Sequence, residues 1–360
     1  MSPEILRQPA EVVYAAELAA LRRDDDGPRP VGWALSPQRV LTYLLGGTAP
    51  DGTTIIPKYV GNRRLLQTAV ATLATDRALL LLGVPGTAKS WVSEHLAAAI
   101  TDDSTMMVQC TAGTDENQIR YGWNYAQLLA HGPSQDALVP TPLFRAMQQG
   151  RLCRLEELTR MGSDVQDTLI TVLSEKTLPI PELDAAVYAA RGFNVIATAN
   201  NRDKGVNELS SALKRRFNVV VLPVPDSFEE EVSIVSRRVA ETAVGLDLPV
   251  PKNVDDEIRR VLVVFRELRS GETEDGKATL KTPSGSLSTA EAIATMIGGL
   301  SHAAWFSGGR LSADELAQTM VGAIVKDPVQ DREVLSEYLE TVVKKRQGYA
   351  AYYAALNDAL

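Results

Sequence analysis

Short apolar runs alternate with segments of helical periodicity in the middle of the chain. Five runs are apolar enough to be buried strands, and they span residues 78–82, 106–110, 152–155, 193–199 and 219–222. Segments with apolar residues at helical spacing lie beside them, at residues 63–75, 90–100, 142–149 and 165–173. Strands that alternate with helices favour a mostly parallel sheet with helices on both faces. The pattern therefore predicts an α/β fold with a parallel five-stranded sheet.

The chain beyond residue 225 has few strand-like runs. Its helical segments span residues 228–241, 254–269, 288–297, 313–325 and 332–345. Pro223 and Pro225 end the preceding part, because two prolines cannot continue a central strand. Residues 11–21 have helical spacing and lie before the first strand-like run. We expect an N-terminal helical appendage at residues 1–57, an α/β domain at 58–225 and an all-α domain at 226–360.

Composition and charge restrict the class of protein. The chain has 360 residues, enough for two domains, and its 45% hydrophobic and 23% charged residues are typical of a soluble globular protein. The net charge of -8 disfavours nucleic-acid binding. The N-terminus lacks a signal-peptide pattern, and no stretch reaches the roughly 20 apolar residues of a membrane helix. We expect a cytoplasmic protein in which Cys110 and Cys153 are buried thiols.

The first candidate motif follows the first strand-like run. The segment Gly-Val-Pro-Gly-Thr-Ala-Lys-Ser at residues 83–90 matches G-x-x-x-x-G-K-[ST], except that Ala88 replaces the second glycine. Such a loop wraps backbone N–H groups around phosphate oxygens at a helix N-terminus. Lys89 would reach the β- and γ-phosphates, and the Ser90 hydroxyl would bind Mg²⁺. The alternative is a glycine-containing turn with an incidental Lys-Ser pair. The predicted nucleotide-binding residues are Gly83, Val84, Pro85, Gly86, Thr87, Ala88, Lys89, Ser90 and Trp91.

Two acids follow the third strand-like run. A phosphate-loop hydrolase needs an acid that orients the metal and a base that activates water at the end of a neighbouring strand. Glu156 and Glu157 occupy that place. We predict that Glu156 helps Ser90 to hold Mg²⁺ and that Glu157 activates the attacking water. The alternative is that both acids simply begin a helix.

Polar residues at the ends of the last two strand-like segments complete the candidate site. Asn200 follows the run 193–199 and would orient the attacking water or contact the γ-phosphate. The alternatives are a plain turn, or a guanine-reading tetrapeptide at residues 200–203, which resembles Asn-Lys-x-Asp. Arg216, and second to it Arg215, would stabilise the transferring phosphoryl group. Cations are favourable at a helix C-terminus in any case, so a structural role is the alternative.

These motifs, in this order, resemble those of the AAA+ ATPases. They lie at residues 83–90, 152–157, 193–200 and 213–217. The loop Gly-x-Pro-Gly-Thr-Ala-Lys-Ser resembles that of the MoxR branch, in which the alanine is usual, and residues 139–146 resemble that branch's approach to the acids. The resemblance covers residues 58–225 well, residues 226–360 only by helical character, and residues 1–57 not at all.

The resemblance implies an assembly and a role. AAA+ modules of this kind form rings, usually hexamers, with ATP between subunits, and the equivalent of Arg216 acts on the neighbour's nucleotide. The segment 118–137 falls where the branch carries an insert facing the central pore, so Tyr121, Trp123 and Tyr125 are candidate substrate contacts, with aromatic packing as the alternative. MoxR-like proteins remodel or mature client complexes, commonly with a partner that bears a von Willebrand factor A domain.

The chain departs from the family pattern at three places. Glu156 replaces the usual Asp, Arg154 interrupts the apolar strand, and residues 282–309 contain no Lys or Arg to sense the γ-phosphate from the helical lid. Hydrolysis is therefore expected to be slow, or the metal to be held differently. We expect an ATPase that uses ATP and Mg²⁺. The two rival hypotheses are an ATP-binding scaffold with negligible turnover and a GTP-driven motor subunit of a DNA restriction or repair complex.

Overall fold

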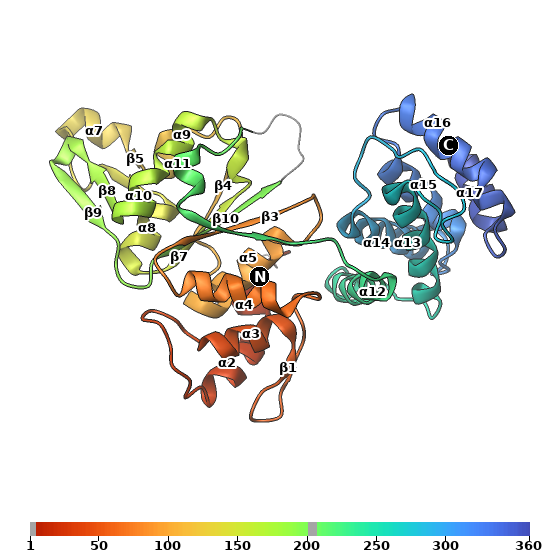
Figure 1. Ribbon diagram of the computed structural model, residues 1–360, viewed down its shortest axis with the longest axis horizontal. Helices are drawn as coiled ribbons and strands as arrows, with labels where there is room; N and C mark the ends of the chain where they lie inside the picture. The colour runs from red at the N-terminus through yellow and green to blue at the C-terminus, as the bar shows by residue number, and fades with distance from the viewer. Residues whose placement is uncertain (1–4, 201–206) are drawn as a thin grey trace. The chain divides into compact units, whose positions relative to one another are not determined.

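The computed structural model describes residues 5–200 and 207–360. The chain forms two compact units, one of Met1–Val84 and Ala88–Pro223, the other of Pro85–Thr87 and Val224–Leu360. The first is an α/β unit and the second is helical (Figure 1). Over the described residues, no helix is both long enough and apolar enough to cross a membrane.

The first unit is built on a five-stranded sheet whose strands are all parallel, as predicted. Its order is β11 (Phe217–Val221), β3 (Ala78–Gly83), β10 (Asn194–Asn200), β7 (Leu152–Glu156) and β4 (Met107–Gln109). Ala197 of β10 pairs with Leu80 of β3 on one side and with Leu155 of β7 on the other. The carboxyl ends of β3, β10 and β7 therefore meet at one edge of the sheet.

Helices cover both faces of this sheet because its central strands are apolar on both faces. The helices of the unit outside the N-terminal segment are α4 (Arg63–Leu73), α5 (Lys89–Thr101), α6 (Glu116–Ile119), α7 (Tyr125–His131), α8 (Pro142–Gln149), η1 (Leu158–Arg160), α9 (Ser163–Asp167), α10 (Leu169–Glu175), η2 (Pro181–Leu183) and α11 (Ser211–Lys214). Leu79 and Leu81 lie in one core with residues of α4 and α5. Leu80 lies in the other core with residues of α8 and α10. Alternate residues of β3 thus enter different cores.

The N-terminal segment packs on this unit. It contains α1 (Ala10–Val13), α2 (Ala15–Arg23), α3 (Pro37–Leu45) and the hairpin β1 (Gly47–Thr48) and β2 (Thr54–Ile55). The helix expected at residues 11–21 is interrupted at Tyr14. Leu21 of α2 and Leu44 of α3 are fully buried in the core that contains Leu79 and Leu81. This segment therefore covers the face of the sheet on which α4 and α5 lie.

The α/β unit also contains two short pairs of antiparallel strands outside the main sheet. One consists of β5 (Tyr121–Trp123) and β6 (Leu138–Pro140), the other of β8 (Thr177–Ile180) and β9 (Ala185–Tyr188). Tyr121 is buried against Phe144, with ring centroids 6.5 Å apart, and its hydroxyl donates to Glu182 at 2.7 Å. Tyr125 is exposed. Tyr121 thus has a packing role, and substrate contact by this segment stays a prediction.

The second unit is a helical bundle with its own core. Its helices are α12 (Phe228–Gly245), α13 (Val254–Ser270), α14 (Thr289–Phe306), α15 (Ala313–Ile324), α16 (Gln330–Thr341), η3 (Val343–Lys345) and α17 (Ala350–Ala359). Ser288 and Glu291 form a capping box at the start of α14, which satisfies its first backbone N–H groups. Glu231 of α12 is buried and pairs with Arg266 and Arg269 of α13, which fixes these two helices together.

Candidate functional site

The loop between β3 and α5 has the backbone of a phosphate-binding turn. Gly86 has a φ of +80°, and Ala88 has φ 61° and ψ 23°. A left-handed conformation costs a residue with a Cβ about 1 kcal/mol. Ala88 therefore stands at the position of the motif's second glycine and adopts a backbone conformation that disfavours alanine but that glycine reaches without this cost.

The lysine of this loop is held inside it. Lys89 is 9% exposed, and its Nζ donates to the carbonyls of Gly83 at 3.1 Å and Val84 at 2.9 Å. Ser90 follows on the first turn of α5 and is exposed. A helix of this length carries partial positive charge at its N-terminus, which favours an anion there. The loop thus gathers a lysine, a hydroxyl and a helix N-terminus at the carboxyl end of β3.

Trp91 turns toward the N-terminal segment. Its indole Nε1 donates to the carbonyl of Lys58 at 2.8 Å. Its ring also lies 4.2 Å from that of His95, centroid to centroid. This anchoring links the first turn of α5 to the chain that precedes α4. A contact between Trp91 and a nucleotide stays a prediction.

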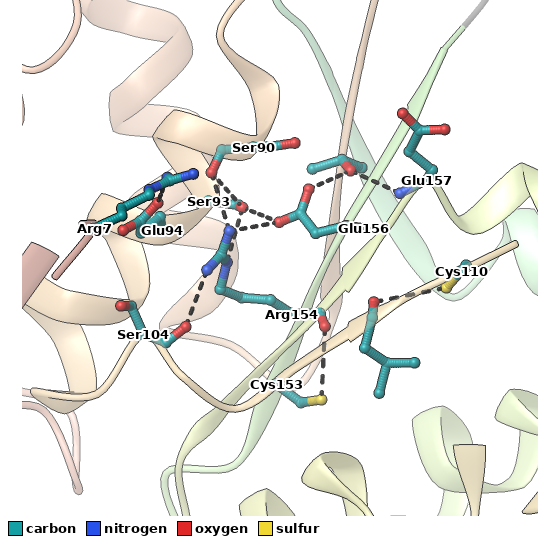
Figure 2. Close-up of polar contacts among 12 residues, drawn as sticks. Arg7, Ser90, Ser93, Glu94, Ser104, Cys110, Cys153, Arg154, Glu156 and Glu157 are labelled. Carbon is teal, nitrogen blue, oxygen red and sulfur yellow. Dashed lines mark hydrogen bonds and ion pairs between the residues drawn. The ribbon is translucent and has the colours of Figure 1, made fainter. Parts of the chain in front are cut away.

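The two acids at the end of β7 face different surroundings. Glu156 is 3% exposed and points toward α5, whereas Glu157 points away from that helix (Figure 2). Glu157 has a φ of 58° and is only partly buried, and its carboxylate forms an ion pair with Arg160. The left-handed backbone conformation at Glu157 turns the two consecutive carboxylates in different directions. One acid is therefore held inside the protein and the other remains accessible.

Hydroxyl groups from two other elements hold Glu156. Its Oε1 accepts a hydrogen bond from Ser93 of α5, and its Oε2 accepts one from Thr198 of β10 at 2.7 Å. The Thr198 hydroxyl also accepts the backbone N–H of Glu157 at 3.0 Å. One buried hydroxyl on the neighbouring strand thus positions both acids. Thr198 belongs to none of the motifs in the sequence, although a hydroxyl within an otherwise apolar strand is a signal for such a role.

Arg154 is a buried cation within β7, and its hydrogen bonds show how the fold accommodates it. Its guanidinium donates to Glu156 Oε1 at 2.9 Å, Ser93 Oγ at 3.1 Å, the Ser104 carbonyl at 3.0 Å and the Ser90 carbonyl at 3.2 Å (Figure 2). The side chain is 8% exposed. A buried charge is tolerated when it is paired and hydrogen-bonded. The residue that interrupts the apolar pattern therefore forms the centre of a polar network.

This network keeps Glu156 ionised. Burial pushes the pKa of Glu156 up, but the Arg154 guanidinium and hydrogen bonds from Ser90, Ser93 and Thr198 outweigh it and hold that pKa below its ordinary value. A group whose pKa lies below its ordinary range is a carboxylate at neutral pH. Glu156 is therefore an oxygen donor beside the loop.

The donor set fits a magnesium ion bound together with a nucleotide. No group of three or more His, Cys, Asp or Glu suited to hold a metal by itself occurs among residues 5–200 and 207–360. Mg²⁺ usually takes one or two protein oxygens and fills its shell with water and substrate phosphates. The Ser90 hydroxyl and the Glu156 carboxylate are ligands of that kind. The cysteines do not contribute, since both thiols are buried and free, and burial raises the pKa of Cys110 to about 12.

Asn200 and the two arginines lie at different ends of the sheet. Asn200 ends β10 and pairs in register with Gly83, so it lies at the edge that carries the loop. Arg215 and Arg216 precede β11, whose first residue pairs with Ala78 at the other end of β3. Arg216 donates to Ser174 of α10 and, at 2.6 Å, to the carbonyl of Ala212. The structure therefore brings Asn200 close to the loop and leaves the arginines about the length of a strand away, roughly 16 Å.

The guanine-reading hypothesis depends on residues that the structure does not describe. Residues 201–203 of that tetrapeptide lie outside the described residues, and Asn200 alone does not distinguish guanine from adenine. Arg266 and Arg269 of the helical unit both donate to Glu231. A lid arginine that senses the γ-phosphate stays a prediction.

Comparisons with known proteins agree with this geometry. Residues 78–217 match the AAA domain of the dynein-related subfamily, and residues 229–356 match the C-terminal domain of YehL-like AAA+ ATPases. The uncharacterized protein YehL of Escherichia coli is 42% identical over 370 residues, covering 99% of both chains. An uncharacterized protein of Staphylococcus haemolyticus is 28% identical over 153 residues, which cover 42% of this chain and 57% of that one.

Solved structures are similar in fold. NtrX from Brucella abortus in complex with ADP superposes with a TM-score of 0.52 at 15% identity, covering 83% of this chain and 64% of that chain. At that identity the likeness concerns the fold alone. The match to YehL extends over nearly the whole of both proteins, and the two family models together reach from the first strand of the sheet to the last helix. The chain therefore belongs to the family of YehL-like AAA+ ATPases.

Proposed function

We propose that this protein binds ATP at the loop 83–90 and hydrolyses it to ADP and phosphate. The arrangement that carries the proposal is the meeting of Lys89, Glu156 and Asn200 at the carboxyl edge of β3, β7 and β10. A loop lysine, a buried carboxylate and a strand-end amide on adjacent parallel strands are the parts that phosphoryl transfer to water requires.

Each of these groups has one task in the proposed reaction. Lys89 leaves its two loop carbonyls and neutralises the β- and γ-phosphates. Ser90 and Glu156 hold Mg²⁺, which supplies charge neutralisation on the phosphates when it is bound. Glu157 takes the proton of the attacking water, and Asn200 orients that water. Glu157 suits the role of base because it is partly accessible, whereas Glu156 is enclosed.

We further propose that the active form is a ring, with six subunits as the expected number. Its support is the position of Arg216 at the end of the sheet remote from the protein's own loop. In a ring this arginine would stabilise the phosphoryl group of a neighbouring subunit. A von Willebrand factor A domain protein as partner, and the remodelling or maturation of a client complex as the output, are proposals that rest on the resemblance to MoxR proteins.

The first experiment measures ATP hydrolysis as a function of protein concentration. The variants are wild type, Glu157→Gln and, as a matched control, Glu333→Gln on the exposed side of α16. We expect the wild-type rate per subunit to rise with concentration, because the site is completed by a neighbour. Glu157→Gln should lower the rate by about 100-fold or more while ATP still binds. Glu333→Gln should behave as wild type.

Two outcomes would replace this proposal. If wild type binds ATP and assembles without turnover at any concentration, the protein is an ATP-dependent scaffold, a function that the ion pair of Arg154 with Glu156 favours. If unlabelled GTP displaces labelled ATP as well as unlabelled ATP does, the site is not selective for adenine.

A further inference from the structure

The candidate metal acid already has a cation as its partner. Arg154 and Glu156 lie two residues apart on β7, so their side chains leave the same face of the strand. Their charged groups are 2.9 Å apart, and both side chains are at most 8% exposed. The pair is therefore neutral as a unit and is poorly screened by solvent.

The acceptor positions of Glu156 are also largely used. A carboxylate offers about four lone-pair sites. Ser93 and Arg154 occupy Oε1, Thr198 occupies Oε2, and the Ser90 hydroxyl is a further donor to this carboxylate. A metal ion, or a water bound to it, would compete with these donors. The extra methylene of glutamate relative to aspartate lets the carboxylate reach back to this set of donors.

Arg154 also fixes the geometry of the loop. Its two bonds to Ser90 and Ser93 connect β7 to the first turn of α5, and its bond to Ser104 reaches the chain before β4. The guanidinium therefore holds the acid, the start of α5 and the edge of the sheet at fixed distances. Such bracing would exist whether or not Arg154 affected a metal.

We propose that Arg154 is a positioning residue that holds Glu156 against α5 and offsets its charge, so that nucleotide binding by this protein depends only weakly on Mg²⁺. The inference rests on the proposed function, because it concerns the same nucleotide site. It predicts that phosphate contacts from Lys89 and the loop supply most of the affinity, and that the metal contributes little to it.

The test compares nucleotide affinity with and without the metal. The probe is a fluorescent, non-hydrolysable ATP analogue, titrated into the full-length protein in excess EDTA and in saturating Mg²⁺. The quantity measured is the dissociation constant in EDTA divided by the dissociation constant in Mg²⁺. For wild type we expect a ratio of about three or less, below the range usual for strongly coupled ligands.

Three substitutions separate the effect of the charge from the effect of the bracing. Arg154→Met removes the cation and should raise the ratio roughly tenfold, the order expected when one unit charge near a cation is lost. Arg154→Lys keeps the charge and loses the planar fork, so its ratio should stay near that of wild type. Ser93→Ala weakens the same bracing without changing any charge, and its ratio should also stay near wild type.

The design remains informative if Arg154→Met does not fold. Glu156→Gln and the double variant Arg154→Met/Glu156→Gln form a second comparison. The double variant removes the buried pair together, so folding is better tolerated. In Glu156→Gln the guanidinium keeps its hydrogen bonds to Ser90, Ser93 and Ser104. The ratio should be higher in the double variant than in Glu156→Gln. An unchanged or lower ratio on loss of Arg154, or a strongly Mg²⁺-dependent wild type, overturns the inference. No binding by wild type in either buffer overturns the proposed function instead.

Discussion

At the scale of single residues, hydroxyl groups determine where the two acids point. Thr198 is 1% exposed and joins the carboxylate of Glu156 to the backbone N–H of Glu157. Ser93 holds the other oxygen of Glu156 from α5. Neither hydroxyl faces solvent, so each bond compensates a group that would otherwise be buried without a partner.

Replacing Thr198 should therefore affect both stability and catalysis. Thr198→Val keeps the shape of the side chain and leaves the N–H of Glu157 and one oxygen of Glu156 without this partner. We expect a loss of about 1–3 kcal/mol in the free energy of unfolding, measured by urea denaturation. The ATP hydrolysis rate of Thr198→Val should also fall, because both acids lose the hydroxyl that positions them. Thr198→Ser retains the hydroxyl and should lose less than about 1.5 kcal/mol, and an equal loss in both variants would contradict the role assigned to the hydroxyl.

At the scale of elements, a buried cluster joins α2 and α3 to α5. Lys58 is 5% exposed, and its ammonium lies 4.1 Å from the ring centroid of Tyr14 and 4.7 Å from that of Tyr43. The same nitrogen donates to Glu17 at 2.6 Å. The carbonyl of Lys58 accepts a hydrogen bond from the indole N–H of Trp91, the residue after Ser90. The N-terminal segment is therefore linked to the start of α5, the helix that follows the loop 83–90.

Removing one charge of this cluster should be costly. Glu17→Gln leaves the Lys58 ammonium buried without its counter-ion, which should lower the free energy of unfolding by about 3–5 kcal/mol. As a control, Glu116→Gln breaks the ion pair with Arg120, in which Glu116 is half exposed, and should cost less than about 1 kcal/mol. Thermal or urea unfolding followed by circular dichroism measures both. Equal losses of unfolding free energy in the two variants would mean that the buried pair of Glu17 and Lys58 stabilises the protein no more than an exposed ion pair does.

Glu231 gives the helical unit a pH dependence with a definite sign. Burial raises its pKa, but the hydrogen bonds and charges of Arg269 and Arg266, with Thr289, outweigh burial and lower the pKa below its ordinary value. A lowered pKa contributes stability above the unfolded value of about 4.3, and that stability is lost as pH falls below it. Glu231→Gln should cost about 3–5 kcal/mol near pH 7.

The difference between Glu231→Gln and wild type is the measurement for this prediction. Urea unfolding curves recorded at several pH values should show the difference shrinking as the pH drops below about 4. A difference that stays constant, or that grows, in that range would contradict the lowered pKa.

The elements differed in how far the sequence predicted them. The five strands of the sheet were predictable because each coincides with a short apolar run, and the three inner strands, β3, β10 and β7, are buried on both faces. The strand pairs β5–β6 and β8–β9 were not, since their strands have only three or four residues and one strand of each pair, β6 and β8, includes a proline. The break at Tyr14 has no glycine or proline to mark it and arises where the chain packs on α5 and the rings of the Lys58 cluster.

The candidate site was predictable as a set of residues but not as a network. Local motifs identify Lys89 and the two acids, because their spacing from a strand end is diagnostic. The partners of Arg154 on α5 and before β4 are 61 and 50 residues away in the chain. Only the tertiary fold brings these partners together. In the sequence, the charge of Arg154 therefore looks like an interruption of an apolar strand.

At the scale of the whole molecule, the protein has separate cores. The buried apolar residues of the helical unit, from Val232 to Leu356, form one cluster among the described residues. The clusters of the α/β unit contain residues from 18 to 222. Each unit therefore buries its own apolar side chains, as an independently folding domain does.

The helical unit should accordingly fold when it is separated from the rest. A fragment of residues 224–360 is expected to show a helical circular dichroism spectrum and a cooperative thermal transition. The full chain should show a second transition that ATP shifts upward, because a ligand stabilises the unit that binds it. A fragment that aggregates or lacks a cooperative transition would show that the bundle needs the α/β unit.

The core shared by α2, α3 and β3 also determines which fragments of the protein can fold when they are expressed alone. The matched AAA domain begins at residue 78, yet Leu79, Leu81 and Leu96 are covered by side chains from residues 18–73. A fragment cut at the ends of that match would leave one face of the sheet bare. Cells that express it would accumulate inclusion bodies, and an inactive product would say nothing about the nucleotide loop. The smallest soluble piece that can report on this loop therefore starts ahead of α2.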